Sequence, residues 1–137
     1  MGLHHIRDEI EKEIIRKLEA EDSIPIGDVC ERIHGKDGYK NGIYCILDEN
    51  NNVIYVGMVS NAKNTSLNKR IYEHGSGAHK NKPWFDEASA VRFHRFEKWD
   101  VNQLRIAERL VIKHYGQPIY NDECTEDNYL RNMDWSM

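Results

Sequence analysis

The chain is poor in the features that mark secreted and membrane-spanning proteins. Its three cysteines, Cys30, Cys45 and Cys124, are odd in number and widely spaced, which excludes a disulfide framework and a zinc signature. No apolar run approaches the roughly 20 residues that span a bilayer, and the first residues lack the apolar core and cleavage site of a signal peptide. We therefore expect a reduced, cytoplasmic protein with no membrane partner. The sequence leaves the oligomeric state open.

The chain also lacks a basic excess. Its 137 residues carry a net charge of -4, with 39% hydrophobic and 31% charged residues, as in a single soluble globular domain. This balance excludes a surface that attracts nucleic acid everywhere, but it permits a local basic face. Residues 63–82 predict such a face, or alternatively a solvated loop. They contain one acid, Glu73, and the cations Lys63, Lys69, Arg70, Lys80 and Lys82.

Periodicity predicts two helices near the start of the chain. In residues 3–20, apolar side chains recur at three- and four-residue steps with charges between them. Pro25 breaks this pattern, and Val29, Cys30 and Ile33 suggest a second short helix that stops at Gly35. The pair could be half of a helix-turn-helix module or a structural cap on a sheet.

The central prediction is a β-hairpin over residues 42–57. Two short apolar runs flank a turn rich in Asp and Asn, which tolerate a left-handed backbone. Each run carries one tyrosine, and pairing Tyr44 with Tyr55 would bring two phenols together. The alternation of apolar and polar residues over 91–96 predicts a third strand.

Two further helices are predicted after the hairpin. The first runs from Leu67 to about His74, so that Arg70 and His74 share a face. The second runs from Val101 to about Tyr115, with Asp100 as N-cap and Gly116 after its end.

Glu108 lies on the apolar stripe of this last helix. A carboxylate there must be paired, bind a metal, or sit where the stripe opens into a cleft.

These groups suit the cleavage of a phosphodiester. A carboxylate can hold a divalent ion that neutralises the phosphate and the leaving oxygen. A guanidinium can clamp the non-bridging oxygens, because it stays charged at neutral pH. A Tyr or His can take a proton from water if its pKa is lowered.

With these residues in order, the chain resembles the GIY-YIG nucleases, which include homing endonucleases, the incision subunit of bacterial excision repair and some restriction enzymes. The resemblance covers roughly residues 40–122. Gly-Ile-Tyr at 42–44 matches the first signature and Tyr-Val-Gly at 55–57 matches the second. The later landmarks match Arg70, His74, Glu108 and, after a Pro-containing turn, Asn121.

The resemblance implies an α+β fold with a small central antiparallel three-stranded sheet flanked by helices. Residues 1–36 would form an N-terminal helical extension, 37–122 the nuclease-like core, and 123–137 a tail that packs on the core or trails from it. The implied function is a metal-dependent endonuclease that hydrolyses DNA, whose backbone would contact Lys63, Lys69, Lys80 and Lys82.

The family also implies a role for each site residue. Tyr44 or Tyr55 would activate or position the attacking water, and His74 would be the base or orient that tyrosine. Arg70 would stabilise the phosphate. Glu108 would hold one Mg²⁺ or Mn²⁺, and Asn121 would fix the geometry of the site.

The chain departs from the family at Met58, where many members carry a Lys directly after the second signature. Lys63 or Lys69 could supply that charge instead. Two other functions stay open at this point. One is a catalytically inactive module that binds nucleic acid, and the other is a protein-interaction domain whose N-terminal helices recruit a larger nuclease.

Overall fold

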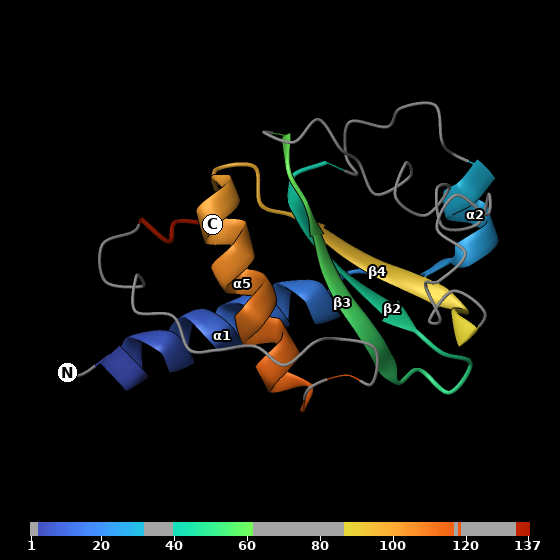
Figure 1. The fold of residues 1–137 in the computed structure, drawn as a ribbon, viewed down its shortest axis with the longest axis horizontal. Helices are drawn as coiled ribbons and strands as arrows, with labels where there is room; N and C mark the ends of the chain where they lie inside the picture. The colour runs from blue at the N-terminus through green and yellow to red at the C-terminus, as the bar shows by residue number, and fades with distance from the viewer. Residues whose placement is uncertain (1–2, 32–39, 62–86, 117, 119–133) are drawn as a thin grey trace.

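An antiparallel sheet organises the fold, with helices α1 and α5 on one side and α2 on the other (Figure 1). The structure is a computed structural model, and it describes residues 3–31, 40–61, 87–116, 118 and 134–137. The elements are α1 (Leu3–Glu19), β1 (Ile24–Pro25), α2 (Ile26–Glu31), β2 (Gly42–Leu47), β3 (Val53–Val59), β4 (Ala90–Arg95) and α5 (Val101–His114). The α+β class and the predicted hairpin, third strand and last helix are therefore confirmed.

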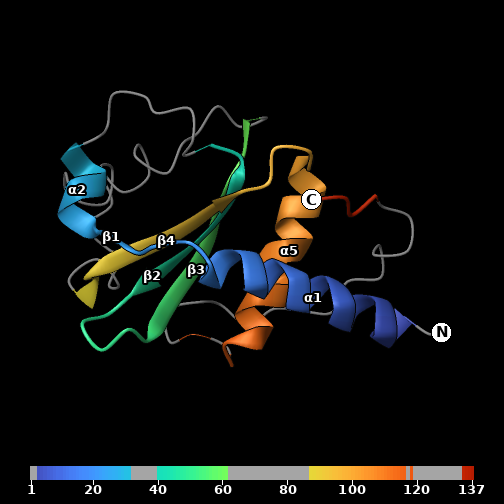
Figure 2. The same cartoon turned by 180° about the vertical axis from the view of Figure 1, so that it is seen from behind.

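The sheet has four strands in the order β1-β4-β2-β3, so the predicted count of three was wrong. The extra strand is β1, in which Ile24 pairs with Val91 and Pro25 with Ala90 (Figure 2). Two residues are too few for an alternating pattern to appear in the sequence. Pro25 can join the sheet because β1 is an edge strand, where a missing N–H is tolerated.

β1 also separates α1 from α2, so the two helices are joined by a strand of the sheet rather than by a simple turn. Ile26, at the start of α2, packs against the cluster formed by Tyr44, Ile46 and Phe93 on one face of the sheet. These contacts agree with a structural cap on the sheet. The predicted end of α2 at Gly35 lies outside the described residues.

The hairpin of β2 and β3 closes through an Asp-centred turn. One carboxylate oxygen of Asp48 accepts the backbone N–H groups of Asn50 and Asn52, each at 2.9 Å, and Asn51 has a left-handed φ of 64°. The backbone N–H of Asn52, which donates to this carboxylate, is the main reason why the pKa of Asp48 lies below its ordinary value. The turn therefore contributes stability above the ordinary carboxyl pKa that is lost as the pH falls.

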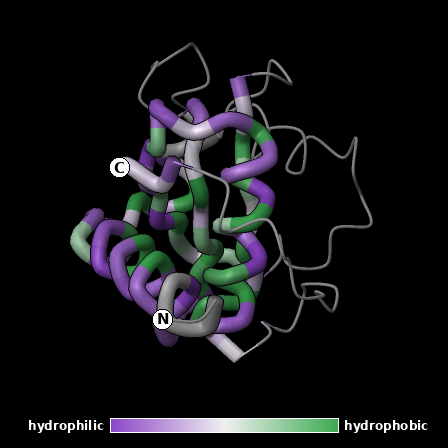
Figure 3. Tube along the Cα trace, turned by 90° about the vertical axis from the view of Figure 1, so that its left-hand side faces the viewer, coloured by the Kyte–Doolittle hydropathy of each residue, from purple (hydrophilic) through white to green (hydrophobic). Residues whose placement is uncertain are grey.

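The helix-side face of the sheet is buried by α1 and α5. Ile14 and Leu18 of α1 and Leu104, Ala107 and Val111 of α5 are fully buried in one cluster with Cys45 and Val56 of the sheet. Along the chain, hydrophobic residues of the helices alternate with hydrophilic ones (Figure 3). Because Ile14 and Leu18 lie in one cluster with Cys45 and Val56, α1 is part of the same core as the hairpin.

The last helix begins and ends where its sequence predicts. Asp100 accepts the backbone N–H of Gln103 at 2.9 Å, and the Gln103 side chain accepts the Asp100 N–H at 3.1 Å, which forms a capping box. Gly116 follows the helix with a φ of 72°, which suits glycine.

The end of the chain docks beside the start of α5. Trp135 contacts Trp99 edge-to-face at 5.1 Å, and the Trp99 indole N–H donates to the Ser136 carbonyl at 3.1 Å. Residues 134–137 therefore pack on the body through Trp135. Tyr129, Leu130 and Met133 lie outside the described residues.

Because α1 shares the core of α5, replacing Leu18 with alanine should destabilise the whole domain. We expect Leu18→Ala to lower the free energy of unfolding by about 2–5 kcal/mol, measured in urea by circular dichroism. Lys12→Ala, on the exposed side of α1, is the matched control and should change it by less than about 0.5 kcal/mol. Two separate unfolding transitions would show instead that α1 folds apart from the sheet.

Candidate functional site

The two tripeptides lie on neighbouring strands and meet at one residue pair. Tyr44 of β2 stands opposite Gly57 of β3, and a Cβ on Gly57 would overlap with the Tyr44 ring carbon Cζ and its hydroxyl. The phenol of the first signature therefore occupies the space left by the glycine of the second. Tyr44 is only 1% exposed, so this contact is part of the core.

Tyr55 lies diagonally from Tyr44 rather than directly opposite it. Ile46 is the residue opposite Tyr55, and the rings of Tyr44 and Tyr55 are 6.1 Å apart with a tilt of 44°. A β-bulge places Ile54 and Tyr55 together against Ile46, because Leu47 already pairs with Val53. Sequence reasoning thus found the neighbouring phenols but not the register. Tyr55 is half-buried and is the more accessible of the two.

Glu108 lies at the margin of the buried stripe of α5. Leu104, Ala107 and Val111 are fully buried toward the sheet, whereas Glu108 is half-buried. The helix packs chiefly on β3. Its first turn follows the end of β4, and Tyr115 after its last turn lines the same pocket as Val53 at the start of β3. Glu108, midway along the helix, is therefore level with the middle of β3.

The two tyrosines and α5 are on opposite faces of the sheet. Tyr44 and Tyr55 belong to the cluster with Ile46 and Phe93, and the core residues of α5 belong to the other cluster. β3 is an edge strand, so the two faces meet along it. A single ligand could therefore contact both a carboxylate on α5 and a phenol on β3 only if it were bound at this edge.

The other predicted site residues lie outside the described part of the chain. These are Arg70, His74, Asn121, Lys63, Lys69, Lys80 and Lys82. Their roles stay predictions. The structure thus brings Tyr44 and Tyr55 together, and it places Glu108 on the helix beside the strand of Tyr55.

Met58 points away from the tyrosines. It pairs with Ile43 and packs against the core cluster of α1 and α5. A lysine at position 58 would also point toward α1 and α5. The presence of Met58 instead of a lysine therefore removes no positive charge from the face of the sheet that carries Tyr44 and Tyr55.

Asn41 is the residue that the sequence analysis missed. It directly precedes the first signature, is 4% exposed, and has a left-handed φ of 55°. Its side-chain amide donates to the carbonyls of Phe96 at 2.8 Å and Trp99 at 3.0 Å, and its side-chain oxygen accepts the Asn61 N–H at 3.2 Å. The Asn-Gly pair at 41–42 was the available signal, because this dipeptide favours a left-handed backbone.

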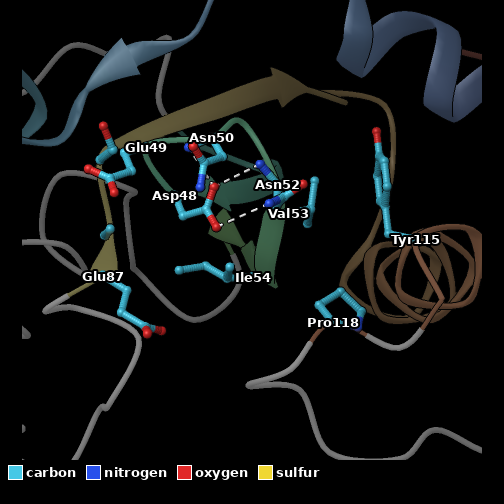
Figure 4. Close-up of a pocket in the computed structure, with 11 residues that line it drawn as sticks. Asp48, Glu49, Asn50, Asn52, Val53, Ile54, Glu87, Tyr115 and Pro118 are labelled. Atoms are coloured by element: carbon cyan, nitrogen blue, oxygen red, sulfur yellow. Dashed lines mark hydrogen bonds between the residues drawn. The ribbon is translucent and has the colours of Figure 1, made fainter.

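A pocket of about 920 Å³ lies beside the hairpin turn, and neither Tyr44 nor Tyr55 lines it (Figure 4). Asp48, Glu49 and Glu87 supply acids to its wall, and Tyr115 and Pro118 lie across from them. Carboxylates repel a phosphate backbone, so this pocket does not suit nucleic acid. Among the described residues, no group of three or more His, Cys, Asp or Glu side chains could hold a metal ion.

Cys45 is a core residue rather than a nucleophile. It is 1% exposed and pairs with Arg92 across β2 and β4. Burial raises the pKa of its thiol to about 12, although the Arg92 guanidinium acts in the opposite direction. The thiol therefore stays protonated at neutral pH, and its contribution to stability is lost only as the pH rises from the ordinary thiol value toward about 12.

No family model, curated protein or solved structure matches this chain. In the described part of the chain, no helix is long and apolar enough to cross a membrane.

The contact between Tyr44 and Gly57 predicts a strong effect of one added methyl group. Gly57→Ala should lower the free energy of unfolding by about 1–3 kcal/mol, because the Tyr44 ring must shift within a packed core. In a Tyr44→Leu background, Gly57→Ala should lower the free energy of unfolding by less. A double-mutant cycle in urea would measure the difference. Gly27→Ala is the control, since nothing lies within 4 Å of the added carbon. Equal losses in the wild-type and Tyr44→Leu backgrounds would contradict the contact.

The burial of Cys45 predicts slow alkylation. In a Cys30→Ser/Cys124→Ser variant, iodoacetamide at pH 8 should label the native chain at least about 100-fold more slowly than the unfolded chain. Mass spectrometry over time gives both rates. Comparable rates would mean that the thiol is accessible.

Proposed function

We propose that this protein is a metal-dependent endonuclease of the GIY-YIG type that hydrolyses phosphodiester bonds in DNA. One observation carries the proposal. The two signature tripeptides lie on paired strands, and the tyrosine of the first fills the space over the glycine of the second. Two tripeptides that matched by chance would have no reason to form this contact.

The active site in this proposal lies along the edge formed by β3. Tyr55 offers a half-buried phenol on one face of this strand, and Glu108 belongs to the helix that packs on the other face. A scissile phosphate at this edge would meet both groups without entering either packed core. The two faces of the sheet are otherwise filled by hydrophobic clusters.

Tyr55 is the better candidate to position the attacking water, because it is half-buried whereas Tyr44 is fully buried. Tyr44 then acts as a positioning residue that fixes the register of the hairpin. Arg70 would clamp the non-bridging oxygens, and His74 would accept the proton of the water. Asn121 would fix the geometry of the site, and Lys63, Lys69, Lys80 and Lys82 would hold the DNA backbone.

Glu108 fits the single carboxylate that this chemistry requires. Mg²⁺ keeps several water ligands and needs only one or two protein carboxylates together with substrate phosphate. A half-buried carboxylate at the margin of a helix leaves room for those waters. A divalent ion bound there would neutralise charge on the phosphate and on the leaving oxygen.

A second candidate is a nucleic-acid-binding module without catalysis. The observation that favours it is the burial of Tyr44, which is only 1% exposed, since a phenol inside the core cannot touch a substrate. The presence of Tyr55, Arg70 and Glu108 in one chain favours the enzyme.

Removing Glu108 or Arg70 should abolish cleavage without unfolding the protein. With Mg²⁺ or Mn²⁺ and plasmid, branched, single-stranded and duplex DNA, we expect Glu108→Ala and Arg70→Ala to cleave at least about 100-fold more slowly than the wild type. Agarose and sequencing gels give the rates.

Lys113→Ala is the matched control for Glu108→Ala, because Lys113 is exposed on the same helix. It should cleave as the wild type does, and all variants should keep the same circular dichroism spectrum. Undiminished cleavage by Glu108→Ala would overturn the metal assignment. Binding of DNA by the wild type with no strand breakage at several pH values would favour the second candidate.

A further inference from the structure

The buried side-chain amide of Asn41 forms hydrogen bonds at the ends of three strands, β2, β3 and β4. Asn41 leads into β2, which carries Tyr44. Phe96 and Trp99, whose carbonyls accept its N–H groups, lie between β4 and α5. Asn61, whose backbone N–H donates to its side-chain oxygen, follows β3. The amide therefore contacts the chain just before the helix of Glu108 and just before residues 62–86, which include Arg70.

The hydrogen bonds of this side chain fix its orientation. Both donors and the acceptor of the amide have partners, as a buried amide requires. The backbone adds a fourth bond, from the Phe96 N–H to the Asn41 carbonyl at 2.8 Å. On the next residue, a Cβ on Gly42 would overlap with the His94 carbonyl, so β2 and β4 approach too closely for a side chain there.

We propose that Asn41 is a positioning residue of the nuclease site, an inference that rests on the proposed function. By holding Phe96 and Trp99, it sets where α5 begins relative to β2, since the N-cap Asp100 follows directly. Glu108 lies on the same helix, about 12 Å beyond the N-cap. A shift at the start of this rigid element displaces the carboxylate relative to Tyr55.

The substitution Asn41→Gly separates the side chain from the backbone. Glycine adopts the left-handed φ of 55° without strain and keeps the carbonyl that accepts the Phe96 N–H. It removes only the three side-chain hydrogen bonds. Ile14→Val is the control for a general loss of stability, because Ile14 belongs to the core cluster but takes no part in the hydrogen bonds of Asn41. Both variants are compared at a temperature where thermal melts show each to be fully folded.

We expect Asn41→Gly to lower kcat by about 10- to 100-fold, because small misplacements of catalytic groups have effects of this size. KM for duplex DNA should change less than about twofold, since uniform substrate binding is left intact. The affinity for Mn²⁺, measured from the free ion by electron paramagnetic resonance, should fall. Ile14→Val should keep the wild-type kcat and Mn²⁺ affinity.

The results distinguish a failure of this inference from a failure of the proposed function. If the wild type cleaves and Asn41→Gly has the kcat and the Mn²⁺ affinity of Ile14→Val, Asn41 is a structural residue and this inference is overturned alone. If the wild type does not cleave any substrate, the proposed function is overturned and this inference with it.

Discussion

The contact of the Tyr44 ring with Gly57 is the constraint on which the hairpin depends. A side chain on residue 57 would overlap with the phenol, so the pairing of β2 and β3 in this register is strained unless position 57 is glycine. A slip of β2 by one residue would also turn Tyr44 and Ile46 toward α5 and move Cys45 to the opposite face. The same contact thus sets the register of the strands and decides which face of the sheet presents the tyrosines.

The helices cover the two faces of the sheet unequally. α1 and α5 bury the face of Cys45 and Val56 in one cluster, and α2 approaches the face of Tyr44 through Ile26. α5 packs on the edge strand β3 and keeps its apolar stripe in the core, and Glu108 lies at the margin of this stripe. A half-buried carboxylate such as Glu108 can exist there without the desolvation cost of a fully buried charge.

Local patterns predicted most of the regular elements and the neighbouring phenols. Alternation and turn chemistry gave the hairpin and β4, and Asp100 and Gly116 marked the ends of α5, because these signals act within a few residues. The β1 strand was missed because two residues carry no period. The diagonal arrangement of Tyr44 and Tyr55 depends on a bulge, and the role of Asn41 depends on carbonyls 55 and 58 residues away. Long-range contacts of this kind leave little trace in a single sequence.

The differing burial of the two tyrosines bears on how such a site can work. Tyr44 is held in the core by Gly57 and is almost completely enclosed, whereas Tyr55 is half-buried on the edge strand. A group that orients water must reach the substrate, and a group that fixes the register must not move. One phenol cannot satisfy both requirements equally well. In this chain Tyr44 is the fixed ring and Tyr55 is the accessible one. The bulge at Ile54 lies on the turn side of Tyr55, so it changes the register there while Tyr44 stays opposite Gly57.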